Sequence, residues 1–333
     1  QLKITYHVGE EFLDIVDGLR AIDEAIRFLK LDCGDRIGHA LALSMDVEKW
    51  YRTKNNEITL LVQDYLDNIA WFHHALIRYN IQDEDALKGW LESEFSHCFA
   101  LIYEPYIQEL QDLYSDSRRK GMQGKFDIHT YYLSWLLRGD EPSLYKTGSL
   151  NTEARYGRWS NEEINIRKLE DDDIRFIPEV ALMYCLYHYN KDIREKGSEK
   201  KTFHLPDRYR RGVARVQKAM QEEIVRRGIG IELNPSSNIS ISILSGYEEH
   251  PIKMLYNIGL TYNEQELESC PQMNVSINTD DKEVFVTRLE NEYALLALAL
   301  EQVRKADGTP KYKREFIYQW LDNIREMGLR QAF

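Results

Sequence analysis

The first 44 residues alternate between two hydrophobic periods. Residues 2–8 form an apolar, β-branched run typical of a strand. Over residues 11–30 the apolar positions recur at spacings of three and four, which indicates one face of an α-helix. A second short apolar run follows at residues 36–43. A strand, a helix and a strand in this order predict a β-α-β unit with parallel strands.

The pattern changes over residues 45–205, where long amphipathic segments are rich in tyrosine and tryptophan. These segments predict helices over residues 58–79, 86–114 and 174–195. Clusters of Gly, Ser, Asp, Asn and basic residues at 115–127 and 139–159 predict exposed loops. We expect a mainly α-helical region whose aromatic residues serve an oligomer interface, a lid over a pocket, or an autonomous helical core.

The β/α rhythm returns after residue 206. The pattern predicts a helix over 207–227, strands at 229–233 and 275–277, and two final helices over 284–305 and 313–327. We therefore expect one α/β domain, made of residues 1–44 and 206–333, that is split by the helical insertion at 45–205. An insertion of this size is tolerable because the entropic cost of loop closure grows slowly with length.

Composition narrows the class of protein. The 333 residues include 43 basic and 55 acidic side chains, for a net charge of -12, which disfavours binding to the phosphate backbone of nucleic acids. No apolar run is long enough to span a bilayer, and the N-terminus lacks the features of a signal peptide, so we expect no membrane association. The four cysteines show no paired spacing, which favours a reducing, cytoplasmic location over a disulfide framework.

Polar side chains follow each predicted strand, at the end where ligands collect in parallel α/β folds. The segments are His7-Val8-Gly9-Glu10, Arg36-Ile37-Gly38-His39, Glu232 to Asn238, and Asn278-Thr279-Asp280-Asp281. Imidazole and carboxylate groups together are suitable ligands for Zn²⁺, and they also transfer protons. Each segment alone has a simpler explanation, such as a helix cap for paired aspartates, and only their order is specific.

That order resembles the second half of the adenosine and AMP deaminase family, zinc-dependent aminohydrolases with a (β/α)8 barrel. In that family, strand five ends in His-x-Gly-Glu and strand six in Arg-hydrophobic-Gly-His. Strand seven ends in Glu-x-x-Pro-x-Ser-Asn, and strand eight in Thr-Asp-Asp. The resemblance implies an α/β fold that comprises strands 5 to 8 of the barrel. It also implies hydrolytic deamination of adenosine or an adenine nucleotide to the inosine counterpart.

The resemblance also implies a role for each matching residue. His7 and Asp280 would be zinc ligands, and His39 would orient and help deprotonate the attacking water. Glu10 would protonate purine N1, while Asp281 would hydrogen-bond N7 and the Gly9 N–H would lie against N3.

Two features depart from the family. No His-x-His pair, which supplies the remaining zinc ligands at strand one, occurs in the sequence, and the helical His73-His74 pair is not a replacement. The first motif also begins at residue 7, which leaves no room for four preceding β/α units of about 120 residues. We expect the C-terminal portion of an enzyme, inactive in isolation because its zinc site is incomplete.

An incomplete barrel would pair with its missing N-terminal half or with a second copy of the chain, so a homo-oligomer is expected. Two alternatives stay open. The chain is a non-catalytic, deaminase-like assembly or purine-sensing module, or it is an aminohydrolase of another substrate class.

Overall fold

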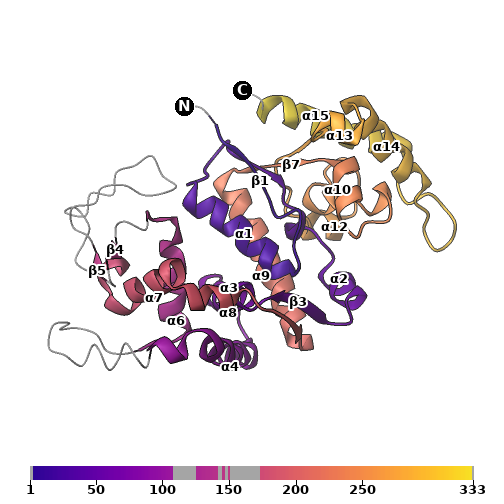
Figure 1. Cartoon of the computed structure of the whole chain (residues 1–333). Coiled ribbons are helices and arrows are strands. Elements are labelled where there is room, and N and C mark those ends of the chain that lie inside the picture. Colours follow the sequence, from indigo (N-terminus) through magenta and orange to yellow (C-terminus); the bar gives the residue numbers. More distant parts are fainter. Residues whose placement is uncertain (1–2, 108–124, 142–144, 147–148, 151–172, 332–333) are drawn as a thin grey trace. The chain divides into compact units, whose positions relative to one another are not determined.

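The computed structural model describes residues 3–107, 125–141, 145–146, 149–150 and 173–331 (Figure 1). The chain divides into two compact units, the first made of Gln1–Asn55 and Val213–Phe333 and the second of Asn56–Gly212. That the middle of the chain is an insertion within a barrel, with limits at 45 and 205, stays a prediction. Several predicted segments, including most of 115–127 and 139–159, lie largely outside the described residues.

The first unit is built on a parallel sheet of four strands. These are β1 (Thr5–Val8), β2 (Arg36–His39), β7 (Gly230–Leu233) and β8 (Val275–Ile277), in the order β1-β2-β7-β8. Every neighbouring pair is parallel, so the carboxyl ends of all four strands lie at the same edge. The predicted β-α-β unit is therefore confirmed, and the mixed α/β architecture is compatible with a (β/α)8-type fold. The assignment to the C-terminal half of a barrel stays a prediction.

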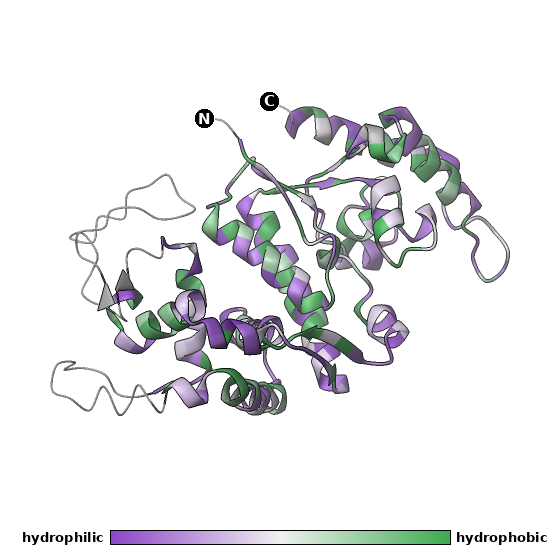
Figure 2. Ribbon diagram, in the orientation of Figure 1, coloured by the Kyte–Doolittle hydropathy of each residue, from purple (hydrophilic) through white to green (hydrophobic). Residues whose placement is uncertain are grey.

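One helix joins β1 to β2, and another leads from the second unit into β7. Helix α1 (Ile15–Phe28) follows β1, and α9 (Asp207–Arg227) leads into β7, as the period of three and four predicted. On α1, Ile15, Leu19 and Ile22 are fully buried, and Figure 2 shows apolar and polar residues sharing this helix. Burial of each such side chain contributes about 1.5–3 kcal/mol, which is how these helices are held against the rest of the unit.

The first unit also contains α2 and the helices that lie before and after β8 in the chain. They are α2 (Val47–Thr53), α10 (Pro235–Ile241), α11 (Ile252–Leu255), α12 (Glu264–Ser269), α13 (Lys282–Phe285), α14 (Leu289–Gln302) and α15 (Arg314–Gln331). The single helix expected over 284–305 is wrong. The chain turns between α13 and α14, where Val286 has a φ of +48° and cannot continue a right-handed helix.

The second unit is mainly helical. Its helices are α3 (Val62–Arg78), α4 (Asp85–Ile102), α6 (Ile128–Leu136), α7 (Pro178–Tyr189) and α8 (Lys191–Gly197), and two short strands, β4 (Tyr145–Lys146) and β5 (Ser149–Leu150), pair with one another. The helix expected from residue 58 is wrong at its start, because β3 (Glu57–Leu61) pairs antiparallel with β6 (Lys200–His204). In β3 only Ile58 and Leu60 are buried, and this period of two was hidden beside the longer period of α3.

All four cysteines are free thiols, as their spacing predicted. Within the described ranges, none of the helices combines the length and the apolar character that crossing a bilayer demands.

Candidate functional site

His39 lies at the carboxyl end of β2, where the backbone turns sharply. His39 and Ala40 have φ values of +64° and +47°, a conformation that side chains other than glycine rarely adopt. Because of this turn, the strand ends at His39, whereas the apolar run in the sequence continues to residue 43. The imidazole is almost fully buried, and its Nε2 lies 2.8 Å from Glu10 Oε2. Backbone strain of this kind persists only where the surrounding contacts enforce it, which makes the turn a candidate functional feature.

Two amides from the loop after β7 hold the His39 ring. Its Nδ1 lies 3.0 Å from Asn238 Oδ1, and its Nε2 lies 3.1 Å from Asn234 Nδ2. An amide oxygen can only accept, so Nδ1 carries the proton in the neutral ring and Nε2 is left as the acceptor. The two asparagines therefore fix both the orientation of the ring and its tautomer.

His7 stands beside His39 because its neighbour in the sheet has no side chain. The register pairs His7 with Gly38, and a Cβ at residue 38 would come within 2.1 Å of His7 Cδ2. The two imidazole rings lie 4.9 Å apart, centroid to centroid, at an interplanar angle of 82°. Gly38 thus provides the space in which the two imidazoles meet.

Asp280 completes the cluster from the loop after β8. Its Oδ2 accepts a hydrogen bond of 2.7 Å from Ser237 Oγ and lies 3.4 Å from His39 Nε2. The ligand atoms of His7, His39 and Asp280 all lie within 4.8 Å of one another. Two imidazoles and one carboxylate are a donor set that Zn²⁺ accepts, so these residues fit the metal.

The chain has known relatives, and a family model matches the segment that carries the β7 and β8 loops. Residues 206–305 match the adenosine deaminase family. Over 93 residues the chain is 32% identical to the adenine deaminase of Agrobacterium fabrum (strain C58 / ATCC 33970) and 28% identical to that of Sinorhizobium fredii (strain NBRC 101917 / NGR234). Over 77 residues it is 34% identical to the adenosine deaminase of Plasmodium gallinaceum.

These matches support the adenosine deaminase family. The two 93-residue matches cover 28% of this chain and 25% of each relative, and the 77-residue match covers 23% and 18%. The chain is thus matched over about a quarter or less of the length of these relatives. Asn234, Asn238 and Asp280 lie inside the matched residues, whereas His7 and His39 lie outside them. The parallel sheet brings these two groups together in space.

Gly9 and Asp281, which the family resemblance assigns to substrate binding, have structural roles beside the cluster. Gly9 is buried with a φ of +73°, and a Cβ there would lie 2.6 Å from Ile22 Cδ1, so the turn requires glycine. Asp281 is exposed, and its Oδ1 accepts from the Val284 N–H at the start of α13. Their contacts to a purine stay predictions.

Sequence reasoning assigned no role to Gly38, Asn234, Ser237 or Asn238. All four lie in the polar segments at the ends of predicted strands. Their position at a strand end could therefore have identified them, whereas their residue types could not. By contrast, the two imidazoles of His73-His74 contact different neighbours in the second unit. His73 Nε2 lies 3.2 Å from Glu92, and His74 Nε2 lies 3.1 Å from His129.

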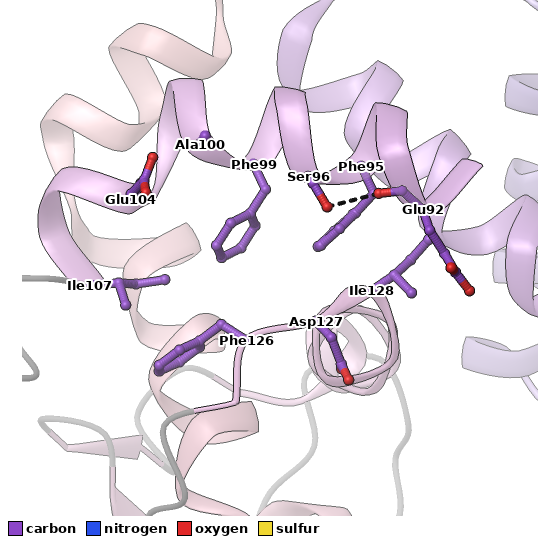
Figure 3. A pocket seen from close by; sticks show the side chains of 10 residues that line it. All are labelled: Glu92, Phe95, Ser96, Phe99, Ala100, Glu104, Ile107, Phe126, Asp127 and Ile128. Atoms are coloured by element: carbon purple, nitrogen blue, oxygen red, sulfur yellow. Dashed lines mark hydrogen bonds between the residues drawn. The ribbon is translucent and has the colours of Figure 1, made fainter. Parts of the chain in front are cut away.

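Two cavities lined by described residues are separate from this cluster. One, of about 680 Å³ in the second unit, is lined by Phe95 and Phe99 of α4 and by Phe126, with carboxylates at its margin (Figure 3). The other, of about 490 Å³ in the first unit, lies between residues 44–49 and residues 243–254. Neither is lined by His7, His39 or Asp280, so volume alone does not locate the chemistry.

Proposed function

We propose that this chain carries part of the active site of a zinc-dependent aminohydrolase that converts adenosine or an adenine nucleotide to the inosine counterpart. The observation that carries the proposal is the convergence of His7, Glu10, His39 and Asp280 from three different strand ends. In the reaction, water adds to the purine carbon that bears the amino group. The carbon–nitrogen bond then breaks, the water oxygen stays in the product, and the nitrogen leaves as ammonia.

His7 and Asp280 would hold the metal, with His39 within reach of the same ion. When bound, Zn²⁺ lowers the pKa of a water ligand to about 7, so a nucleophile is available at neutral pH. Ser237 fixes the Asp280 carboxylate, and the two asparagines fix the His39 ring. Groups that orient metal ligands in this way raise metal affinity and set the tautomer of the imidazole.

His39 and Glu10 form a further contact in the cluster. His39 Nε2 lies 2.8 Å from the Glu10 carboxyl, a distance at which the two groups can share one proton. A protonated Glu10 is the group that deamination needs, because protonation of purine N1 makes the adjacent carbon more electrophilic.

The donor set is incomplete for a four-coordinate zinc ion, and we propose that further ligands come from strands that pair with β1. Among the described residues, β1 is an edge strand; Tyr6 within it and Ile4 just before it are exposed. The pairing strands would belong to the same polypeptide, to a separate N-terminal piece or to a second copy in a homo-oligomer. The intact assembly is then the active form.

A non-catalytic, purine-sensing role is the second candidate. It is favoured by the absence of any His-x-His pair from the 333 residues. It predicts that the intact protein binds adenine compounds without releasing ammonia and that Glu10→Gln leaves its behaviour unchanged.

The deciding experiment measures bound zinc and ammonia release for the intact protein with adenine, adenosine, AMP, ATP and cytosine. We expect Glu10→Gln to retain zinc and to lower turnover about 100-fold or more, because it removes the proton donor. His7→Ala should remove zinc. Zinc content that is insensitive to His7→Ala, together with no ammonia from any substrate, would contradict the proposal.

A further inference from the structure

Helix α14 contains a carboxylate that the proposed reaction does not use. Glu292 is 0% exposed, and three hydrogen bonds satisfy it. Its Oε2 accepts from the Ser236 N–H at 2.8 Å, and its Oε1 accepts from Ser236 Oγ and Thr287 Oγ1, each at 2.5 Å. Burying a carboxylate is costly unless donors surround it, so this position is built for the charge or for the acceptor geometry.

The Ser236 N–H is one of the free donors at the start of α10, a group that the residue preceding a helix usually satisfies. Here the preceding residue, Asn234, makes no capping hydrogen bond. Its amide instead contacts His39 Nε2 at 3.1 Å. Glu292 therefore caps α10 from another helix, and this leaves Asn234 available for His39.

The same carboxylate joins the two loops that carry the candidate ligands and their supports. Ser236 is followed by Ser237 and Asn238. Ser237 donates a hydrogen bond to Asp280, and Asn238 contacts His39 Nδ1. Thr287 lies in the segment that follows α13, just downstream of Asp280 in the loop after β8. Glu292 thus bonds to the backbone and hydroxyl of Ser236, after β7, and to the hydroxyl of Thr287, after α13.

We propose that Glu292 is a positioning residue for this site. By capping α10 and bonding Thr287, its carboxylate holds Asn234, Asn238 and Ser237 where they orient His39 and Asp280. The metal-binding part of this inference rests on the proposed function, whereas the orientation of the His39 ring does not.

The first test observes the His39 ring in the metal-free, intact protein. With ¹⁵N-labelled histidine, the Nδ1–H that donates to Asn238 should give a slowly exchanging NMR signal that His39→Gln removes. Glu292→Gln should broaden or abolish this signal, while Glu290→Gln, an exposed neighbour on the same helix, should leave it unchanged. An unchanged signal in a folded Glu292→Gln protein overturns the proposal, whatever the metal data show.

The second test measures Zn²⁺ affinity by calorimetry and the Co²⁺ absorption spectrum. Loss of an outer hydrogen bond to a metal ligand usually lowers affinity about 10- to 100-fold, and we expect a loss of this size for Glu292→Gln relative to Glu290→Gln. Ser236→Ala removes a single donor, so it gives a milder version if Glu292→Gln does not fold. Lower unfolding stability with an unchanged His39 signal and an affinity within about twofold of the Glu290→Gln control would mean a purely structural role.

The outcomes separate this inference from the proposed function. If the wild-type protein shows the His39 signal, and Glu292→Gln loses it, positioning is supported even where no substrate releases ammonia. If ammonia is released and Glu292→Gln alters neither the signal nor the affinity, the function stands and the positioning role is wrong.

Discussion

At the scale of single residues, the site depends on where a side chain is missing. Gly38 leaves the space that the His7 ring occupies, while His39 and Asp280 adopt positive φ values that aim their side chains toward one another. A positive φ at a residue other than glycine costs about 1–3 kcal/mol, and the neighbouring hydrogen bonds maintain it here. The sequence shows these residues but not the strain.

Gly38→Ala should displace His7 and weaken metal binding without unfolding the sheet. The added methyl group would meet the His7 ring at 2.1 Å, and a ring tip can move away more easily than a strand can. We expect at least a 10-fold loss of Zn²⁺ affinity by calorimetry.

The control is Gly89→Ala, in helix α4, where a Cβ meets nothing within 4 Å. It should stabilise that helix by up to about 1 kcal/mol and leave metal affinity unchanged. Equal affinities for the two variants would contradict this account.

His250 should make the stability of the first unit sensitive to acid. Burial, together with the positive charge of the nearby Lys253, lowers the pKa of this imidazole to about 3. In the unfolded chain its pKa is near 6.5, so between pH 6.5 and 3 the unfolded state binds more protons and stability falls as pH falls. From pH 7 to pH 5, this group alone should cost about 2 kcal/mol.

Urea denaturation at pH 7 and pH 5 measures this effect. His250→Gln should reduce the loss of unfolding free energy between the two pH values. The exposed His204→Gln should retain that loss in full. If all three proteins lose the same amount on acidification, His250 is not the responsible group.

At the scale of elements, helix α9 supports the segment that follows His39. Gln217 Nε2 donates to the carbonyls of Ala42 and Met45, at 2.8 and 3.1 Å, and Gln221 Nε2 donates to Leu43. These carbonyls belong to or flank the short 3-10 helix Leu41–Leu43, all of whose residues are buried. Amphipathic period predicted α9 itself, but nothing in that period indicated that its polar glutamines face a buried turn.

Gln217→Leu should destabilise the first unit by about 1–3 kcal/mol, since it leaves two buried carbonyls without a donor. Chemical denaturation should detect this as a lower midpoint. Lys218→Ala, an exposed change on the same helix, should stay within about 0.5 kcal/mol of the wild type. A Gln217→Leu protein as stable as the control would show that water or another group satisfies these carbonyls.

At the scale of the whole molecule, the chain holds two units, each of which buries some charged side chains among apolar ones. The first is organised by apolar strands and helix faces. The second also buries an ion pair, in which Arg138 donates two hydrogen bonds to the Asp67 carboxylate and lies 3.7 Å from the centroid of the Tyr187 ring. Tyr131 and Gln63 donate to the same carboxylate at 2.5 and 3.0 Å.

Asp67→Asn should lower the stability of the second unit by about 3–5 kcal/mol, because it leaves the Arg138 guanidinium buried without its counter-charge. Hydrogen exchange read by mass spectrometry should show the loss of protection in peptides from α3 and α6. Glu104→Gln, at an exposed carboxylate of the same unit, is the control. Protection equal to that of the control would mean that the ion pair contributes no net stability.

The sequence alone determined most helices and strands and the strand ends that carry the polar side chains. Both depend on the spacing of apolar residues that are near one another in the chain. Apolar spacing located α1, α9, β7 and β8, and the residues after each strand included His7, Glu10, His39 and Asp280. Hydrophobic spacing gave wrong boundaries at two places. It missed β3 before α3, and it missed the turn between α13 and α14. Only the tertiary structure decided which side chains touch. The space at Gly38, the amide contacts of His39 and the cap that Glu292 supplies join residues distant in the chain, and long-range packing and hydrogen bonding leave no local pattern to read.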